Sequence, residues 1–332
     1  MKKFMPYVLS LLAALLLMAC SGKASSPQEE PAPTGEAAAQ PETSGETQAS
    51  HTESSPTSIT VTDMSGREIT LTEPATRIVA LTASDCEILY ALGAGDTLVG
   101  RGEYCDWPSQ VTEVPSVQSG ADTNIEQIIA LNPQVLLMST MAQTQEQIAA
   151  LENAGIQVVV SDAQDIAGVY EAITLIGTLM GKTQEADALV ADMQATFGNI
   201  QTEASGDKKT VYFEVSPLEY GLWAGGSDTF MDEIAQMLGL TNIFADIRGW
   251  GEISQEQVIE RAPDYIVTVT MYFGEGPTPE EEISSREGWE NIPAIQKGRI
   301  LNLQNNELSR PGPRLAEGAQ MLFDFVYGQD AA

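Results

Sequence analysis

The residues of this 332-residue sequence that could hold a ligand are large aromatic side chains and arginines in short segments that follow predicted strands. Aromatic residues make up only 6% of the chain, yet three of its four tryptophans fall in these predicted loops, and only Trp289 lies in a later connector. Large flat side chains bury much area at little cost in conformational entropy, so a group of them could stack on a ligand. Each could instead pack as core that anchors its own loop. The candidate ligand-binding residues are Tyr104, Trp107, Tyr220, Trp223, Trp250, Tyr272, Arg248, Arg310 and Arg314.

The sequence offers little to an enzyme, because its only histidine is His51. That residue lies in a predicted tether, so the folded part has no imidazole to act as a base or a metal ligand. The phosphate-binding pattern Gly-x-x-x-x-Gly-Lys-Ser/Thr is absent, and Gly93-Ala94-Gly95 follows a predicted helix, whereas a dinucleotide loop would follow a strand. Carboxylate pairs are plentiful, but in so acidic a chain they indicate solvated surface. We therefore expect a binding protein with no catalytic residue, no cofactor and no metal site of its own.

The charge of the chain excludes a nucleic-acid partner. The sequence has 16 Lys+Arg against 47 Asp+Glu, for a net charge of −31. From Thr57 onward it has thirteen basic and forty-one acidic residues, so the acidity belongs to the folded part. Affinity for a phosphate backbone comes from lysines and arginines that displace counterions, and this body carries the opposite charge.

The N-terminus predicts export. Lys2 and Lys3 precede an apolar run over residues 8–19, which is shorter than the roughly 20 residues that span a bilayer. Residues 1–19 are therefore predicted to be a signal peptide. The run ends in Leu17-Met18-Ala19-Cys20, which resembles the lipobox of bacterial lipoproteins, whose cysteine is diacylated and becomes the new N-terminus. The alternative is an ordinary signal peptide that happens to meet a cysteine.

A tether is predicted over residues 20–57. This segment is rich in Ser, Thr, Pro, Glu, Ala and Gln and has no aromatic residue, so it cannot bury enough apolar surface to offset the entropy of ordering the chain. His51 lies inside it and is expected to be solvated.

The two remaining cysteines, Cys86 and Cys105, could form a disulfide. Cys86 lies at the start of a helix after the first strand, and Cys105 lies in the loop after the second. Adjacent parallel strands would bring these positions close together, and export permits a disulfide. The same positions would also suit two buried free thiols or a thiolate that ligates a metal.

The elements that must position these residues form two α/β halves. Residues 59–71 alternate around a turn and predict a hairpin, and the following segments alternate strand with helix, which predicts a parallel sheet covered on both faces. Strands are predicted at 77–81, 98–100, 135–138 and 158–160, and helices at 84–92, 125–131 and 143–154. In such sheets ligands bind beyond the carboxyl ends of the strands.

A long helix separates the halves. Apolar residues at helical spacing predict one helix over 165–181 and a second over 183–204, about 30 Å long at about 1.5 Å per residue. The second alternation has strands at 210–215, 265–270 and 299–303 and helices at 228–238, 255–261 and 314–326. The predicted fold class is α/β. An N-terminal lobe (58–182) and a C-terminal lobe (205–332), each with a mainly parallel sheet, are joined by one long rigid helix, and the ligand cleft lies between them.

Together these segments resemble the substrate-binding proteins of ABC importers for iron chelates, haem and cobalamin, over essentially all of residues 59–328. The stretches that carry the resemblance are 77–93, 124–133, 253–258, 288–299 and 310–314. The resemblance implies two lobes bridged by one rigid helix, which open less than hinged binding proteins do. It also implies docking on the permease through one glutamate of each lobe, here Glu126 and Glu256. Exposed glutamates at helix starts, favoured by the helix dipole, are the alternative.

The resemblance narrows the ligand to a metal-bearing macrocycle or chelate. Tyr104-x-Asp106-x-Pro108 and Trp250 look like the cobalamin-binding members, although those members often carry another tryptophan where this chain has Gly120-Ala121-Asp122. A corrinoid is therefore the favoured ligand. Haem would have to use Tyr104, Tyr220 or Tyr272 on its iron, and an anionic ferric siderophore would favour Arg248, Arg310 and Arg314. Those arginines could instead form salt bridges that hold the lobes.

The expected partners follow from the same resemblance. We expect a monomer, anchored by lipid on the extracytoplasmic face of the bacterial plasma membrane, that delivers its ligand to an ABC permease dimer with its ATPases. Any cobalt or iron would belong to the ligand. A surface adhesin or sensor lipoprotein of the same fold is the alternative from a different functional class.

Overall fold

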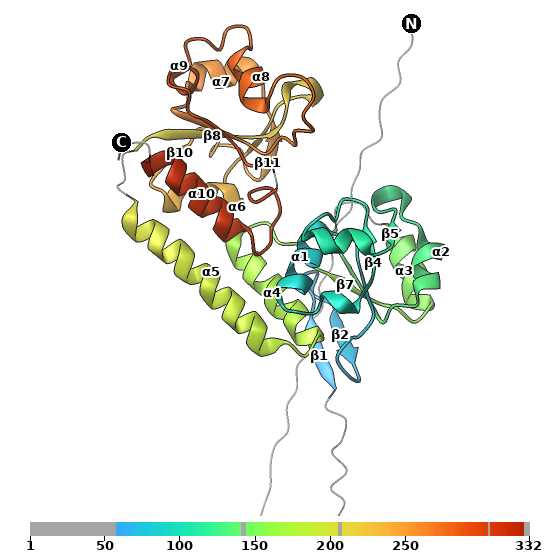
Figure 1. The fold of residues 1–332 in the computed structure, drawn as a ribbon. Helices are drawn as coiled ribbons and strands as arrows, with labels where there is room; N and C mark the ends of the chain where they lie inside the picture. Colours follow the sequence, from blue (N-terminus) through green and yellow to red (C-terminus); the bar gives the residue numbers. More distant parts are fainter. Residues whose placement is uncertain (1–57, 141–143, 205–207, 305, 329–332) are drawn as a thin grey trace, which may run out of the picture. The chain divides into compact units, whose positions relative to one another are not determined.

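The computed structural model describes residues 58–140, 144–204, 208–304 and 306–328, which form two α/β lobes (Figure 1). The predicted signal peptide, the tether, Cys20 and His51 lie outside the described residues. We call residues 58–182 the N-lobe and residues 208–328 the C-lobe. No helix among the described residues is long and apolar enough to cross a membrane.

The N-lobe begins with the predicted hairpin and continues as a parallel sheet. Strands β1 (Ile59–Thr62) and β2 (Glu68–Leu71) pair antiparallel. The sheet has the order β5-β4-β3-β6-β7, and every pair in it is parallel, as predicted. Its strands are β3 (Ile78–Ala80), β4 (Leu98–Gly102), β5 (Ser116–Val117), β6 (Val135–Met138) and β7 (Gln157–Val160). The four residues of β6 are all buried, which explains its continuous apolar sequence.

Helices α1 (Ala83–Ala91), α2 (Ile125–Leu131) and α3 (Gln145–Asn153) connect these strands. Short 3-10 helices lie at Gly95–Thr97, Ser109–Glu113 and Gly120–Asp122. The side chain of Asn124 caps the start of α2, and Asn132 ends it in the left-handed conformation before Pro133.

The C-lobe sheet is mixed, in contrast to the N-lobe sheet. Its order is β11-β9-β8-β12-β13, with the short strand β10 also paired to β8. The strands are β8 (Thr210–Ser216), β9 (Trp223–Gly225), β10 (Thr241–Asn242), β11 (Trp250–Glu252), β12 (Tyr265–Thr268) and β13 (Ile300–Asn302). Strands β8, β12 and β13 are parallel, whereas β9 pairs antiparallel with both β8 and β11.

The prediction that Trp223 and Trp250 lie in loops was therefore wrong. They are the first residues of β9 and β11. Each strand has only three residues, including a glycine, so neither shows the alternation that identifies a strand in sequence.

The C-lobe helices are α6 (Phe230–Met237), α7 (Gln255–Arg261), α8 (Pro279–Ser284), α9 (Pro293–Gln296) and α10 (Leu315–Tyr327), with a 3-10 helix at Leu218–Tyr220. Trp289, between α8 and α9, is fully buried, and the Arg286 guanidinium lies 4.6 Å from its ring centroid.

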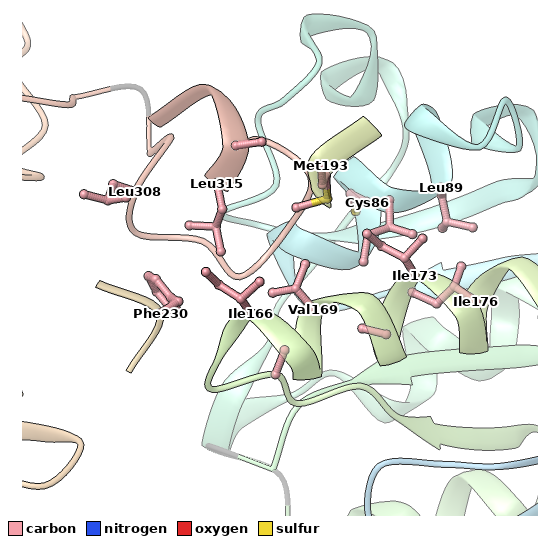
Figure 2. Close-up of a cluster of buried hydrophobic side chains, with 14 of the residues drawn as sticks. Cys86, Leu89, Ile166, Val169, Ile173, Ile176, Met193, Phe230, Leu308 and Leu315 are labelled. Atoms are coloured by element: carbon pink, nitrogen blue, oxygen red, sulfur yellow. The ribbon is translucent and has the colours of Figure 1, made fainter. Parts of the chain in front are cut away.

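The last helix of the N-lobe is α4 (Ile166–Leu179), and α5 (Thr183–Glu203) links this lobe to the C-lobe. The predicted inter-lobe helix is confirmed as α5, one residue shorter than expected. It packs against α4 along one part of its length and against α10 and α6 along the other (Figure 1). One apolar cluster runs through this junction (Figure 2): Leu89 of α1, Val169 of α4, Phe230 of α6 and Leu315 of α10 all belong to it. The lobes therefore share a core as well as a connector.

Candidate functional site

A cleft of about 480 Å³ lies between the lobes at the carboxyl ends of their strands. We call it the inter-lobe cleft. The N-lobe lines it with residues after β3, β6 and β7, and the C-lobe with Val215, Val269, the start of α6 and Trp250. Hydroxyl groups from Thr82, Ser84, Ser139, Ser161 and Ser309 interrupt an otherwise largely apolar lining. Such a surface suits a large, mostly apolar ligand with a few hydrogen-bonding groups.

Aromatic side chains face this cleft from both lobes. Tyr104, in the N-lobe loop after β4, is 75% exposed. Trp250 is half-buried: its ring packs on Phe230 at 5.3 Å between centroids, and its Nε1 donates to Gln164 Oε1 at 3.5 Å. Trp250 is therefore held in place before any ligand arrives, whereas Tyr104 is free to stack on one.

The described lining of the cleft has no cation free to bind an anion. Among the described residues that line it, only Asp162 and Arg310 are charged. Arg310 donates to Glu87 Oε1 at 3.1 Å and to Asp106 Oδ1 at 2.6 Å. Arg314 donates to both oxygens of Glu87, at 3.0 and 2.7 Å. We call Glu87, Asp106, Arg310 and Arg314 the Glu87 cluster. It joins the lobes through two carboxylates and two arginines. Arg310 and Arg314 therefore make the salt bridges between lobes that the sequence offered as the alternative to ligand binding.

A buried carboxyl group lies behind the N-lobe wall of the cleft. Asp85, in the first turn of α1, is fully buried and accepts a hydrogen bond from the Thr82 hydroxyl through Oδ2. Its Oδ1 has no hydrogen-bond partner in the described part of the chain. Burial raises the pKa of Asp85 to about 6, against smaller lowering effects of Thr82 and Ser161. Asp85 therefore places a titratable carboxyl group behind this wall, with no atom exposed to the cleft.

A second depression of about 630 Å³ lies in the C-lobe and contains two more of the predicted residues, Tyr220 and Tyr272. We call it the C-lobe hollow. It shares Val215 and Val269 with the inter-lobe cleft, so the two cavities adjoin along these side chains.

The other predicted ligand-binding residues lie elsewhere. Trp107 and Arg314 line a groove of about 370 Å³, where the guanidinium lies 4.6 Å from the Trp107 ring centroid. The Arg248 side chain is 88% exposed and pairs with Asp228 at 2.7 Å, beside another depression. Trp223 lines none of these cavities. The structure thus brings Tyr104, Trp250 and Arg310 together in the cleft, with Tyr220 and Tyr272 in the hollow beside it.

Several residues of the cleft are absent from the sequence prediction. Ser161, Asp162 and Gln164 line it, and they directly follow β7, so the rule that ligands bind beyond strand ends could have found them. Phe230 and Met231 also line it, although each is only 1–2% exposed and carries the sequence signature of core.

The two remaining cysteines are both free and buried in the structure, which agrees with the predicted pair of buried free thiols and not with a disulfide. They lie close together, as neighbouring strands β3 and β4 require: hydrogen bonding to Cys105, with burial, raises the pKa of the Cys86 thiol well above its usual value. No group of three or more His, Cys, Asp or Glu residues in the described ranges could hold a metal ion.

Glu126 and Glu256 occupy matching places in the two lobes. Each is the second residue of an exposed seven-residue helix, α2 or α7. Each helix is capped by a side chain, from Asn124 or Ser254, and ends in a left-handed residue followed by proline and a central strand. Hydrogen bonds from its own backbone and from Ser254 lower the pKa of Glu256. Both glutamates are therefore available to a partner.

The chain is similar in sequence and fold to known proteins. Residues 78–307 match the family model described as periplasmic binding protein. An uncharacterized ABC transporter substrate-binding lipoprotein of Bacillus subtilis, YvrC, is 34% identical over 251 residues, which cover 74% of this chain and 77% of that protein. A vitamin B12-binding protein of Pectobacterium carotovorum is 25% identical over 71% of this chain and 83% of its own. A solved structure described as a possible iron-binding (periplasmic solute-binding) protein of Staphylococcus epidermidis is 30% identical, with a TM-score of 0.64 over 77% of this chain and all of that one.

Proposed function

Because the chain belongs to the periplasmic binding protein family, we propose that it captures a corrinoid outside the cytoplasm and delivers it to an ABC permease. It is a substrate-binding protein of ABC transport for ligands of the B12, haem or siderophore type, and not an enzyme. The choice of a corrinoid among these ligands is the more specific part of the proposal. Curated relatives named as vitamin B12-binding proteins, 24–26% identical to this chain, support it.

The charge of the inter-lobe cleft is the observation that favours a corrinoid over an anionic chelate. Arg310 is held by Glu87 and Asp106, and Asp162 and the buried Asp85 stand on or behind the opposite wall. An anionic tricatecholate chelate would meet negative charge, and the described lining offers no free cation to compensate. A corrinoid presents amide groups around a large flat ring, which match the hydroxyl and carboxylate acceptors and the aromatic pair Tyr104 and Trp250.

Haem is the second candidate, and one observation favours it. Tyr104 places an exposed phenol in the cleft, where it could ligate iron. The carboxylates of haem, however, would need cations, and the nearest arginines are already paired within the Glu87 cluster.

A thermal-shift panel tests the ligand class. The purified full chain is melted alone and with cyanocobalamin, cobinamide, haem, a neutral ferric hydroxamate or a ferric tricatecholate. A ligand that binds only the folded protein at 100 times its Kd adds about 2.7 kcal/mol to stability. We expect the melting temperature to rise with cyanocobalamin. A rise with haem or a ferric chelate, and none with either corrinoid, would overturn the proposed ligand.

The permease contact is proposed to use Glu126 and Glu256. Exposed carboxylates at equivalent helix starts can form charge-assisted bonds with cations on a membrane subunit and steer its approach. In cells, Glu126→Lys with Glu256→Lys should abolish uptake while cobalamin affinity of the purified protein stays unchanged. Glu146→Lys, in the first turn of the exposed helix α3, is the matched control. Uptake that survives the double reversal would contradict the docking assignment and favour a sensor or adhesin role.

The anchor is proposed to be a lipid on Cys20, in the sequence Leu17-Met18-Ala19-Cys20. The Bacillus subtilis relative is named a lipoprotein, which supports this proposal. Cys20→Ser should move the protein from the membrane fraction to the medium or periplasm, since the acyl chains that hold it would be missing. An unchanged membrane fraction would overturn the anchor.

A further inference from the structure

The proposed function assigns no role to the C-lobe hollow. It is formed within one lobe by the end of β8, the segments after β8 and β12, and helix α8, and it adjoins the inter-lobe cleft at Val215 and Val269. A ligand seated in the cleft can therefore reach the hollow by passing over these two apolar side chains.

Exposed apolar side chains surround the hollow. Phe273 is 82% exposed, Tyr220 is 75% exposed and Met271 is 47% exposed. Large apolar residues gathered at a concave site are typical of a surface that is covered when a ligand binds. Aromatic rings also lose little conformational entropy on contact, which makes them suitable anchors.

The floor of the hollow is rigid. Glu214, at 1% exposure, and Glu282 line it, and both accept hydrogen bonds from Arg286 at 2.6 Å. The Tyr272 hydroxyl donates to the Gly276 carbonyl at 3.2 Å and so braces the loop that carries Phe273. The floor is formed before binding, so little of the ordering cost of binding falls on this part of the protein.

The chemistry of the hollow limits what it would accept. Glu219 and Glu275 stand among the lining residues beside the aromatic side chains. An end group with a flat, neutral or cationic ring would stack on the aromatic rings, whereas a carboxylate end group would be repelled.

We propose that the C-lobe hollow is a subsite for an aromatic base at the end of a flexible arm of the ligand, so that the receptor selects complete corrinoids over truncated ones. This inference rests on the proposed function. The cleft of about 480 Å³ and the adjoining hollow of about 630 Å³ offer separate spaces for a ring and for its arm. A compact ligand without an arm would use the first cavity alone.

The test compares two ligands that differ in the arm. Cobalamin carries a nucleotide arm that ends in an aromatic base, and cobinamide has the same corrin ring without it. Isothermal titration measures both on the wild-type full chain and on the double variant Tyr220→Ala, Phe273→Ala. Trp223→Ala is the matched control, because this exposed aromatic residue of the same lobe lines neither cavity. Melting temperatures verify that each variant is folded.

The expected result is selective. Loss of base–aromatic stacking should weaken cobalamin binding about ten-fold in the double variant. Cobinamide binding should change less than two-fold, and Trp223→Ala should change neither. Equal weakening of both ligands, or no weakening of cobalamin, would overturn the subsite. If the double variant keeps its cobalamin affinity but loses uptake in cells, the hollow would be a permease contact and the inference would be wrong. If the wild-type chain binds neither corrinoid, the proposed function fails first, and the subsite with it.

Discussion

The two lobes bury charged groups in different ways. The C-lobe pairs one of its buried carboxylates with a buried cation of the same lobe: Glu214 and Arg286, at 1% and 6% exposure, are 2.6 Å apart. The N-lobe buries Asp85 with a hydroxyl partner on one oxygen and, within the described chain, none on the second. Another buried carboxylate of the N-lobe, Glu87, pairs with two arginines of the C-lobe, whereas Asp63 pairs with Arg67 of its own lobe.

This difference explains how the Glu87 cluster can hold the two lobes together. The buried charge of Glu214 is neutralised within the C-lobe by Arg286. In the N-lobe, Asp85 Oδ1 has no partner among the described residues, and Glu87 keeps its two arginines only while the lobes stay together. Wide opening would leave a buried carboxylate and two arginines without partners, which is costly. The comparison thus predicts different consequences for charge changes in each lobe.

The largest effect is expected in the C-lobe. Arg286→Met leaves Glu214 buried without its cation and should lower the free energy of unfolding by about 3–5 kcal/mol. Hydrogen bonds to Glu214 and Glu282 outweigh desolvation and raise the pKa of Arg286, so this arginine is charged at any accessible pH. Urea denaturation measures the change. Arg248→Met, which breaks an ion pair whose arginine is 88% exposed, should cost less than about 1 kcal/mol. Equal costs would contradict the contrast between buried and exposed pairs.

The next effect is expected between the lobes. Glu87→Gln removes the charge that Arg314 and Arg310 share and should cost about 2–4 kcal/mol. Hydrogen exchange should rise on both sides of the cleft, at the loop after β4 and at the start of α10. In Arg286→Met the rise should stay within the C-lobe. Exchange confined to the N-lobe in Glu87→Gln would show that the cluster does not hold the lobes together.

The N-lobe should also make the stability of the protein depend on pH, through the buried carboxyl group of Asp85. The pKa of Asp85 is raised by burial from 3.8 to about 6, so the folded state binds more protons than the unfolded state between these values. The stability that protonated Asp85 contributes to the wild-type protein is therefore lost as pH rises from about 4 to about 6. Asp85→Asn should stabilise the protein at pH 7.5 by about 1–3 kcal/mol and have little effect at pH 4.

Denaturation of both proteins across this pH range measures the difference. A loss of stability in Asp85→Asn that is the same at every pH would show that the carboxylate makes structural bonds that the amide cannot replace.

The smallest effect is expected at Glu126 and Glu256, because both are exposed and occupy matching places in the two lobes. Glu126→Gln and Glu256→Gln each remove one exposed charge from the first turn of a helix, which contributes about 0.3–1 kcal/mol. Urea denaturation should give similar small losses for both. A loss above about 2 kcal/mol at either position would indicate a structural role and weaken the docking proposal.

The sequence predicts well what periodicity and strand order control. The parallel N-lobe sheet, the helix at 183–204 and the capped helices that carry Glu126 and Glu256 follow from buried runs, helical spacing and capping residues. Tyr104 is predicted as a cleft residue because it follows a strand, and ligands bind at strand ends in such folds.

The parts of the fold and of the site that the sequence does not predict depend on contacts between residues far apart in the chain. Nothing local distinguishes an arginine that binds a ligand from Arg310, whose partner Glu87 is 223 positions away. Trp223 and Trp250 belong to strands too short to show alternation. The adjoining of the cleft and the C-lobe hollow at Val215 and Val269 requires two separate strands to end side by side.

Equilibrium dialysis against cyanocobalamin tests the central claim most directly. The full chain should retain one corrinoid per molecule, and Tyr104→Ala with Trp250→Ala should weaken retention on the order of ten-fold or more, because both lobes lose their aromatic contact. No retention by the wild-type chain, or equal retention by the double variant, would contradict a corrinoid receptor that works through this cleft.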